Sequence, residues 1–464
     1  MIKQAAISVI RTLRDHGHEA YLVGGCVRDL LLGREPADYD VSTDATPREV
    51  MRIFPETYAV GAQFGVVLVP VDGLTAKDLE AQAKLDPVET PVEAAKHKAI
   101  EVATFRSDGV YTDGRHPDEV RFSKTAAEDV QRRDFTINGL LLDPLDNDRV
   151  IDHVGGRADL DAHIIRTIGE PERRFAEDKL RMLRAVRFAA RFGYSIEPGT
   201  MQAIQRLAPQ IHQVSRERIR EELTKMLTEG AAKRAFELLD ESKLLHEVLP
   251  EVEKMKGVEQ PAQFHPEGDV FVHTLLLLEN LPPNPSRTLA WGALLHDVGK
   301  PATFRRAPDR IRFDGHVDVG VAIAREICNR LRMSNDDIDQ IVALVNNHMK
   351  FADTPKMKES TLKRFLRLHD FDEHLALHRL DCLGSHADLS LYDFVQKKRA
   401  ETPPEEIRPE PLVNGRDLID LGYRPGPTFR EILSAVEDQQ LEGTLTSREA
   451  ALAFVKGNYP VPSD

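Results

Sequence analysis

From Ala20 to Thr43 the chain reads AYLVGGCVRDLLLGREPADYDVST. Two short runs rich in β-branched and aromatic residues flank a helix-like segment, and glycine or polar residues bound each run. Two further β-prone runs follow, FGVVLVPV up to Val71 and IEVATF from Ile100 to Phe105. Strands that alternate with helical segments predict a small α/β head in the N-terminal part of the chain.

Beyond about Arg166 the pattern changes to helical spacing. Apolar residues recur at this spacing in LRMLRAVRFAARF, AIQRLAPQI and RERIREELTKML. Pro-rich breaks at 282–285 and 403–411 interrupt the helical part, and a polar tract at about 72–98 indicates a surface insertion between two strands. The predicted fold class is therefore α+β: a small α/β head with a mixed sheet, followed by a mostly helical remainder.

The composition is that of a globular chain and not of a membrane protein. Of its 464 residues 41% are hydrophobic and 30% charged, and no apolar run approaches the roughly 20 residues of a membrane-spanning helix. Residues 1–24 lack the uninterrupted apolar stretch of a secretory signal. The three cysteines, Cys26, Cys328 and Cys382, are too far apart for a CxxC metal site and odd in number. We expect a cytoplasmic protein of several domains with reduced thiols.

The charge of the chain is uneven along its length. A formal net charge of −14 argues against a protein that coats nucleic acid nonspecifically. Residues 166–225 nevertheless hold 13 Lys/Arg against 8 Asp/Glu, a net charge of +5. An RNA contact fits best in this segment, although solvated helix faces would give the same composition.

Three carboxylates in the predicted head are placed to bind divalent cations. Strand alternation sends Asp38 and Asp40 to the same face, close enough to share a cation through hard oxygen ligands. Glu101 stands between apolar residues on a predicted buried strand, where an unpaired charge would be costly. Taken singly, the aspartates could equally lie in a solvated loop, and Glu101 could pair with Arg106 or Arg121. Together they predict a metal site.

Gly24 and Gly25 stand between a β-prone run and a helix-like stretch that carries Arg28. Bare backbone amides at such a turn can bind phosphate. A Gly-Gly pair is more often an ordinary strand-to-helix turn, so this motif decides nothing on its own.

Read together, the motifs of the head resemble those of the class II tRNA nucleotidyltransferase and bacterial poly(A) polymerase family. In chain order they are GG-x-V-R-D, D-Y-D, E-V-A-T-F-R, R-R-D-F-T-I-N and F-A-E-D-K-L-R-M-L-R-A-V-R-F. One departure is Gly139, where the family usually has alanine. We expect this change to loosen the backbone more than to alter the chemistry.

The resemblance implies addition of nucleotides to an RNA 3′ end without a nucleic-acid template. Asp38 and Asp40 would bind two Mg²⁺ ions, and Glu101 would complete the catalytic site. One ion would lower the pKa of the attacking hydroxyl, and the other would stabilise the leaving pyrophosphate. The residues that would contact the nucleotide are Gly24, Gly25, Arg28, Arg132, Arg133, Asp134 and Asn138.

Asp178 and Arg181, in the sequence EDKLR, are the candidates for choosing the base. Residues three positions apart on a helix share a face, so a carboxylate acceptor and a guanidinium donor would lie side by side. The pair resembles the family's protein template for C and A, which implies CTP and ATP as substrates. An isolated D-x-x-R would more often be an ordinary helical ion pair. Arg184 extends the same stripe and is a further nucleotide-binding candidate.

A second set of candidate metal ligands lies in the C-terminal half and resembles the HD phosphohydrolase family. Borderline metals accept imidazole and carboxylate together, and helices that converge in a bundle can supply both. The resemblance implies a divalent transition metal or Mg²⁺, a metal-activated water and Lys300 as a phosphate contact. The domain could instead be structural and inactive. The candidate ligands are His273, His296, Asp297, His316, His348 and Asp381.

These assignments divide the chain into four parts: a head at 1–165, a nucleotide-selecting and RNA-binding neck at 166–245, an HD domain at 246–400 and a C-terminal helical tail at 401–464. The leading hypothesis is CCA addition to tRNA from CTP and ATP. Close alternatives are an enzyme that adds only A or only CC, and a poly(A) polymerase. Outside this class stand an HD phosphohydrolase whose head only binds nucleotide, and an RNA-binding protein without catalysis. The sequence predicts no oligomeric state.

Overall fold

The computed structural model describes residues 2–61, 65–71, 99–108, 120–261, 263 and 268–460. The chain forms two compact units, Met1–Met226 with Arg234–Val248, and Leu227–Lys233 with Leu249–Asp464. The predicted insertion at 72–98 lies outside the described residues. The division into four domains stays a prediction.

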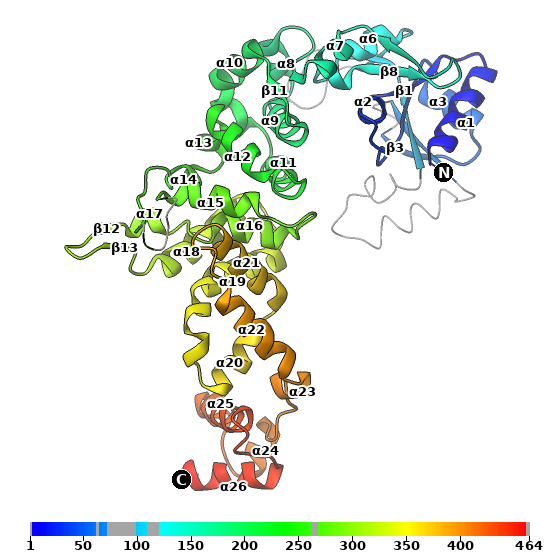
Figure 1. The fold of residues 1–464 in the computed structure, drawn as a ribbon. Coiled ribbons are helices and arrows are strands. Elements are labelled where there is room, and N and C mark those ends of the chain that lie inside the picture. Colours follow the sequence, from blue (N-terminus) through cyan, green and yellow to red (C-terminus); the bar gives the residue numbers. More distant parts are fainter. Residues whose placement is uncertain are drawn as a thin grey trace. The chain divides into compact units, whose positions relative to one another are not determined.

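A seven-stranded mixed sheet forms the head of the first unit (Figure 1). Its strand order is β3-β4-β5-β2-β1-β8-β9, in which β2 and β5 are parallel and the other neighbours are antiparallel. The predicted α+β class is confirmed, and the four β-prone runs form β1, β2, β4 and β5. The strands are β1 (Ala20–Val23), β2 (Asp40–Thr43), β3 (Tyr58–Gly61), β4 (Val66–Pro70), β5 (Ala99–Thr104), β8 (Leu140–Asp143) and β9 (Arg149–Asp152).

Helices cover both faces of this sheet. α1 (Ile2–Asp15) and α3 (Pro47–Ile53) pack on one side, and α2 (Gly25–Leu31) lies on the other (Figure 1). Thr46 and Glu49 form a capping box that fixes the start of α3 directly after β2. The shorter elements of the head are β6 (Arg106–Asp108), β7 (Val120–Phe122), α6 (Ala126–Gln131), η2 (Thr136–Asn138) and α7 (Gly156–Asp161).

The β8–β9 hairpin is a part of the sheet that the sequence analysis missed. It pairs Leu140–Asp143 with Arg149–Asp152 through a turn in which Asn147 and Asp148 have φ of 51° and 53°. Asparagine and aspartate tolerate this left-handed conformation better than other side chains. The signal was therefore present, as an apolar run followed by PLDND.

The remainder of the first unit is helical, as predicted. The run LRMLRAVRFAARF coincides with α9, which ends at Gly193 in a left-handed conformation with φ of 68°. A two-residue parallel pair, β10 (Ile164–Ile165) with β11 (Ser195–Ile196), joins the segment before α8 (Pro171–Glu177) to the segment after α9. The helices are α8 (Pro171–Glu177), α9 (Leu180–Phe192), α10 (Pro198–Leu207), η3 (Ala208–Gln213), α11 (Arg216–Thr228), α12 (Ala232–Glu241) and α13 (Leu244–Val248).

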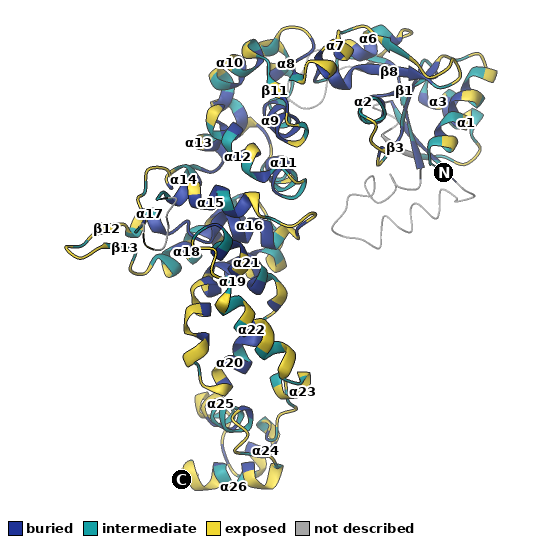
Figure 2. Ribbon diagram, in the orientation of Figure 1, coloured by how far each residue is buried: buried dark blue, intermediate teal, exposed yellow. Residues whose placement is uncertain are grey.

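The second unit begins with a helical bundle whose central helix is α16. Every apolar residue of α16 from Leu289 to Leu295 is buried, whereas α22 (Ser390–Glu401) and α26 (Arg448–Asn458) expose much of their surface (Figure 2). The predicted Pro-rich breaks lie between α15 and α16 and between α22 and α24 (Gly415–Asp420). None of the described helices is long and apolar enough to cross a membrane. The bundle consists of α15 (Val270–Glu279), α16 (Arg287–Leu295), α18 (His316–Arg330), α19 (Asn335–Asn347) and α21 (Phe371–Leu383).

Shorter elements accompany this bundle, and the tail has its own small core around Leu418, Ile432 and Val455. The other elements of the unit are α14 (Pro250–Glu253), α17 (Lys300–Thr303), β12 (Arg305–Arg306), β13 (Ile311–Arg312), η4 (His348–Lys356), α20 (Glu359–Leu366), α22 (Ser390–Glu401), α23 (Pro404–Ile407), α24 (Gly415–Asp420), α25 (Pro427–Leu441) and α26 (Arg448–Asn458).

Candidate functional site

Asp40 and Glu101 lie side by side on the two parallel strands of the head sheet. Asp40 begins β2, and the strand register pairs its Cα with that of Glu101 on β5. Neighbouring strands are about 4.8 Å apart, so the two carboxylates can reach one cation. Asp38 precedes β2; Tyr39 between the aspartates is buried while both aspartates are partly exposed. The predicted alternation therefore extends through this segment.

A cavity of about 210 Å³ opens beside these carboxylates. Asp40 and Glu101 line it together with Arg106, Arg132 and Arg133. A nucleoside triphosphate bound with a cation needs oxygen ligands for the cation and cationic donors for its phosphates. The cavity supplies both. The side chain of Arg121, the other proposed partner of Glu101, lies outside the described part of the chain.

Asp129 forms ion pairs with Arg132 and Arg133. It was not among the site residues predicted from the sequence. Its carboxylate is fully buried and pairs with Arg132 at 2.9 Å and with Arg133 at 3.1 Å. The signal was the spacing D-x-x-R-R, which brings residues three and four positions apart together on a helical turn.

Gly24 forms the turn between β1 and α2 with φ of 77°. A Cβ at this position would lie 3.1 Å from Nη1 of Arg133, so glycine allows the backbone to approach the guanidinium closely. Gly25 is the first residue of α2. Arg28 follows on the same helix, but Nη1 donates to Oδ1 of Asn138 at 2.6 Å and Nη2 pairs with Asp29 at 2.8 Å. Arg28 thus supports Asn138.

Asp134 connects Asn138 to the neck. Its Oδ1 accepts from Nδ2 of Asn138 at 3.1 Å, and its Oδ2 accepts from Nε and Nη2 of Arg184 at 2.9 and 2.7 Å. Burial alone would raise the pKa of Asp134, but Arg184 and Asn138 more than offset this and lower it to about 2. Three of the predicted nucleotide-binding residues therefore form one ordered network.

Gly139 sits in tight packing, which gives a steric reason for glycine at this position. A Cβ at this position would lie 2.8 Å from Val154, 3.0 Å from Val130 and 3.1 Å from Ile168. Branched side chains fill the space that an alanine methyl would need.

The predicted common helical face of Asp178 and Arg181 is wrong. α8 ends at Glu177 and α9 begins at Leu180, and Asp178 between them has an extended backbone with φ −146° and ψ 108°. The side chain of Asp178 accepts from the backbone N–H of Leu180 at 3.0 Å. Aspartate side chains favour such local hydrogen bonds over a continuous helix, which explains the break.

Each member of this pair instead has its own ion-pair partner. Asp178 pairs with Arg218 of α11 at 2.8 Å. Arg181 donates to Glu177 at 2.9 Å and, through Nη2, to the backbone carbonyl of Arg132 at 2.9 Å. The second contact links the neck directly to the arginines of the cavity.

The six predicted HD ligands converge from α15, α18 and α21, from the residues that directly follow α16, and from the first residue of η4, which follows α19. Their ligand atoms form two groups, His273 with His296 and Asp381, and Asp297 with His316 and His348, each within 4.8 Å. Oδ2 of Asp297 is 3.1 Å from Nε2 of His296, and Oδ1 is 3.8 and 3.7 Å from Nε2 of His316 and His348. The carboxylate of Asp297 therefore faces both groups.

All four imidazole rings are oriented by the backbone. The Nδ1 atoms of the rings contact the carbonyl oxygens of Gly384, Ala293, Phe313 and Val345 at 2.7 to 3.2 Å. Donation from Nδ1 leaves the Nε2 lone pair directed at the cluster. Nε2 of His316 and of His348 is buried without a hydrogen-bond partner among the described residues.

The charges of this cluster suit a metal site. Burial lowers the pKa of His316, and it lowers the pKa of His348 to about 4, so both rings are neutral at pH 7. Burial would raise the pKa of Asp297, but Lys300 and His296 hold it well below its usual range. Nζ of Lys300 lies 2.7 Å from Oδ2 of Asp297 and donates to Gln260 at 2.6 Å. Lys300 therefore lies beside the cluster, held between Asp297 and Gln260, and its predicted contact with a phosphate stays a prediction.

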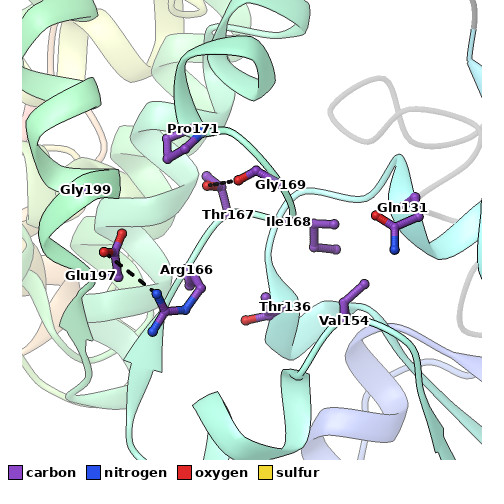
Figure 3. Close-up of a pocket in the computed structure, with 10 residues that line it drawn as sticks. All are labelled: Gln131, Thr136, Val154, Arg166, Thr167, Ile168, Gly169, Pro171, Glu197 and Gly199. Carbon is purple, nitrogen blue, oxygen red and sulfur yellow. Dashed lines mark hydrogen bonds and ion pairs between the residues drawn. The ribbon is translucent and has the colours of Figure 1, made fainter.

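A larger cavity of about 420 Å³ lies between the head and the neck (Figure 3). Arg166 crosses part of it to pair with Glu197 at 3.7 Å, and Thr167 donates to the carbonyl of Gly169. None of the predicted site residues lines it, whereas four of them, Asp40, Glu101, Arg132 and Arg133, line the smaller cavity.

Three family models match successive parts of the chain. The model for the poly(A) polymerase head domain matches residues 20–166. The model for the probable RNA- and SrmB-binding site of polymerase A matches residues 193–256, and the HD domain model matches residues 269–378.

Curated relatives match over nearly the whole chain. The CCA-adding enzyme of Geobacillus thermodenitrificans is 42% identical over 434 residues, which cover 93% of this chain and 91% of the relative. The CCA-adding enzyme of Geobacillus stearothermophilus is 32% identical over the same shares of both chains.

Solved structures agree with this match. The Bacillus stearothermophilus CCA-adding enzyme in complex with CTP superposes with a TM-score of 0.71 at 29% identity, covering 98% of this chain and 96% of that one. The Thermotoga maritima CCA-adding enzyme complexed with tRNA shares the fold, with a TM-score of 0.58 at 19% identity and coverage of 98% and 94%. The chain therefore belongs to the family of CCA-adding enzymes, with the nucleotidyltransferase head and the HD domain that its sequence motifs predicted.

Proposed function

We propose that this protein adds CCA to the 3′ end of tRNA, taking CTP and ATP as substrates without a nucleic-acid template. The observation that carries the proposal is the pairing of Asp40 with Glu101 beside a cavity that also holds Arg132 and Arg133. The named relatives support the choice of RNA and nucleotides, because they are CCA-adding enzymes and their solved structures include complexes with CTP and with tRNA; a further CCA-adding enzyme of the same fold is solved in complex with ATP.

The donor set of the cavity fits Mg²⁺. Asp40 and Glu101 offer hard carboxylate oxygens from adjacent strands. Asp38, two residues before Asp40, offers a third carboxylate. We assign these three residues as the cation ligands. Bound Mg²⁺ would activate the RNA 3′-hydroxyl and stabilise charge on the departing pyrophosphate.

The remaining residues position the nucleotide. Arg132 and Arg133 present planar guanidinium groups that match phosphate oxygens. Asp178 would accept a hydrogen bond from the exocyclic amine of C or A, and Arg181 would donate to a ring nitrogen. Arg218 and Glu177 already fix the orientation of this pair, so the template is preorganised.

The reaction is tested with three tRNA transcripts that end at the discriminator base, at C and at CC. Each is incubated with Mg²⁺ and one nucleoside triphosphate at a time, and the products are resolved by length. The proposal predicts C on the first two transcripts, A on the third, and no use of UTP or GTP. Addition of A to the CC-ending transcript alone would identify an A-adding enzyme, and multiple A additions to any RNA would identify a poly(A) polymerase. No extension of any transcript would refute nucleotide addition.

We also propose the cellular compartment in which the protein acts. All three cysteines are buried and free in the structure. Free thiols suit the reducing conditions of the cytoplasm, and we therefore place the protein there. Localisation of the tagged full-length chain in intact cells tests this assignment.

We infer a second activity at the HD cluster, the hydrolysis of phosphate esters, which would depend on bound divalent cations. The observation that favours it is the pair of buried Nε2 atoms on His316 and His348, which face Asp297 and have no hydrogen-bond partner in the part of the chain that the structure describes. Buried polar atoms without partners are costly, and a cation bound to them removes that cost. One cation fits each ligand group, with Asp297 facing both. A bound transition metal or Mg²⁺ would supply an activated water, and Lys300 would contact the phosphate.

Metal content and hydrolysis test this second activity separately. The full-length protein is dialysed against Mn²⁺, and the retained metal is counted by elemental analysis; hydrolysis of p-nitrophenyl phosphate and bis-p-nitrophenyl phosphate is then followed. His348→Gln should lose metal and activity. His374→Gln is the matched control, because His374 is also buried in this unit with a pKa near 4 but lies outside the ligand groups. Equal metal content in the two variants would count against the site.

A further inference from the structure

We call the cavity of about 210 Å³ that Asp40, Glu101, Arg132 and Arg133 line the transfer cavity. Asp129 on α6 contacts both Arg132 and Arg133 of this cavity. Its Oδ1 accepts from Nε of Arg132 at 3.0 Å and from the backbone N–H of Arg106 at 3.3 Å. Its Oδ2 accepts from Nη2 of Arg133 at 3.1 Å and from the hydroxyl of Ser42 at 3.3 Å. The carboxylate is fully buried, so each of its oxygens depends on protein donors.

The charges around the cavity explain why such a residue is needed. Arg132 and Arg133 share a small space with Asp40 and Glu101. Opposite charges at such distances attract strongly where water is scarce, so unrestrained guanidinium groups would fold onto the carboxylates and compete with a cation. Asp129 supplies a third negative charge on the opposite side of the arginines. Burial would raise the pKa of Asp129, but Arg133 and Arg132 lower it, so it stays ionised.

The guanidinium group of Arg133 has hydrogen-bond donors that could bind a ligand. Nη2 is engaged by Asp129, while Nε is buried without a hydrogen-bond partner among the described residues. Nη1 lies 3.1 Å from the position of a Cβ on Gly24, at the turn of the phosphate-binding motif. A buried unpartnered donor of a charged group points to a missing anionic partner.

Ser42 ties this arrangement to the strand that carries Asp40. The two residues are two positions apart on β2 and therefore face the same side of the sheet. The hydrogen bond from Ser42 to Asp129 thus fixes α6 against the strand of the cation ligand. The arginines that would bind phosphate and the aspartate that would bind the cation are therefore fixed relative to one another.

We propose that Asp129 is a positioning residue for nucleotidyl transfer, which aims the guanidinium groups of Arg132 and Arg133 at the triphosphate and keeps them off Asp40 and Glu101. The inference rests on the proposed function, since it assigns a role within the same reaction. Asp129 itself touches neither substrate nor cation.

The test compares Asp129→Asn with Asp159→Asn in the full-length protein. Asp159 is the matched control: it is 7% exposed, accepts from Thr136 at 2.7 Å and pairs with Arg166 at 3.0 Å, but does not line the transfer cavity. Thermal unfolding measures the structural cost of each substitution. Steady-state addition of A to a CC-ending tRNA gives kcat, the KM for ATP and the Mg²⁺ concentration for half-maximal rate.

Asp129→Asn should raise the KM for ATP at least about tenfold and raise the Mg²⁺ requirement several-fold, with a smaller fall in kcat, because it removes binding of the triphosphate. Asp159→Asn should leave both quantities within about twofold. Ser42→Ala removes one contact of Asp129 and should raise the KM for ATP about two- to fivefold; it carries the test if Asp129→Asn does not fold.

Unchanged KM and Mg²⁺ requirement in the folded variants would overturn the inference and leave Asp129 a structural residue. That outcome differs from failure of the proposed function, in which the unsubstituted protein would add no nucleotide to any tRNA.

Discussion

At Gly24 the backbone passes close to the side chain of Arg133. Gly24→Ala places a methyl in a left-handed conformation and 3.1 Å from Nη1 of Arg133. We predict a several-fold higher KM for ATP and CTP, because the guanidinium must move, together with a loss of roughly 1–2 kcal/mol of stability from backbone strain.

Gly17→Ala is the control for that strain. Gly17 has φ of 86°, but a Cβ there meets nothing within 4 Å. Both variants should lose similar stability in thermal unfolding, and only Gly24→Ala should change nucleotide binding. Equal KM values in the two variants would show that the approach to Arg133 has no function.

The choice of base also depends on single side chains, those of Asp178 and Arg181. Asp178 and Arg181 are each held by a separate partner, so removing one leaves the other in place. We predict that Asp178→Ala and Arg181→Ala lower the ratio of kcat/KM for CTP over UTP at least about tenfold, since one good base contact contributes roughly 1–3 kcal/mol of discrimination. Arg206→Ala, which removes an exposed arginine of the same region, should leave the ratio unchanged. A constant ratio in all three variants would place base choice elsewhere.

At the scale of elements, α21 makes the second unit sensitive to acid. Burial lowers the pKa of His374 and of His378 on this helix to about 4. Between pH 6.5 and 4 the unfolded chain therefore binds protons that the folded chain does not. Stability is full above about pH 6.5 and falls as the pH drops through this window, by up to roughly 3 kcal/mol for each histidine.

Trp291 reports this transition directly. It is the only tryptophan of the chain and is 1% exposed within α16, next to α21 in the bundle. Urea unfolding of metal-free protein, followed by tryptophan fluorescence, should show a midpoint that decreases from pH 7 to pH 4.5. His374→Asn should flatten this dependence. A midpoint that does not vary with pH would contradict the buried neutral state of the histidines.

The elements also show what a sequence can and cannot predict. β1, β2, β5 and α9 follow from local patterns, because alternating or helical spacing reflects burial of one face. The break at Asp178 was missed, since no proline or glycine marks it and a side-chain hydrogen bond to Leu180 decides it. The spacing D-x-x-R-R could have indicated the pairs of Asp129 with Arg132 and Arg133. The hydrogen bonds of Asp129 to Ser42 and Arg106, however, join positions 87 and 23 residues away, which only the folded chain brings together.

At the scale of the whole molecule, the two candidate sites belong to different compact units. The transfer cavity lies in the first unit and the HD cluster in the second. We predict that Asp297→Asn abolishes metal-dependent hydrolysis of p-nitrophenyl phosphate and leaves CCA addition within about twofold, while Asp40→Asn does the reverse. Assays of both activities on both variants check this. Loss of both activities in either variant, with the protein folded, would show that the sites are coupled.

The central claim is that Asp40 and Glu101 hold the cations for nucleotide addition. It is tested most directly by the single-turnover rate at which A is added to a CC-ending tRNA in Mg²⁺. Asp40→Asn and Glu101→Gln should each lower this rate at least about 10³-fold. Asp146→Asn, at an exposed aspartate in the β8–β9 turn, should match the unsubstituted protein. A rate within tenfold of the unsubstituted protein in either cavity variant would contradict the claim.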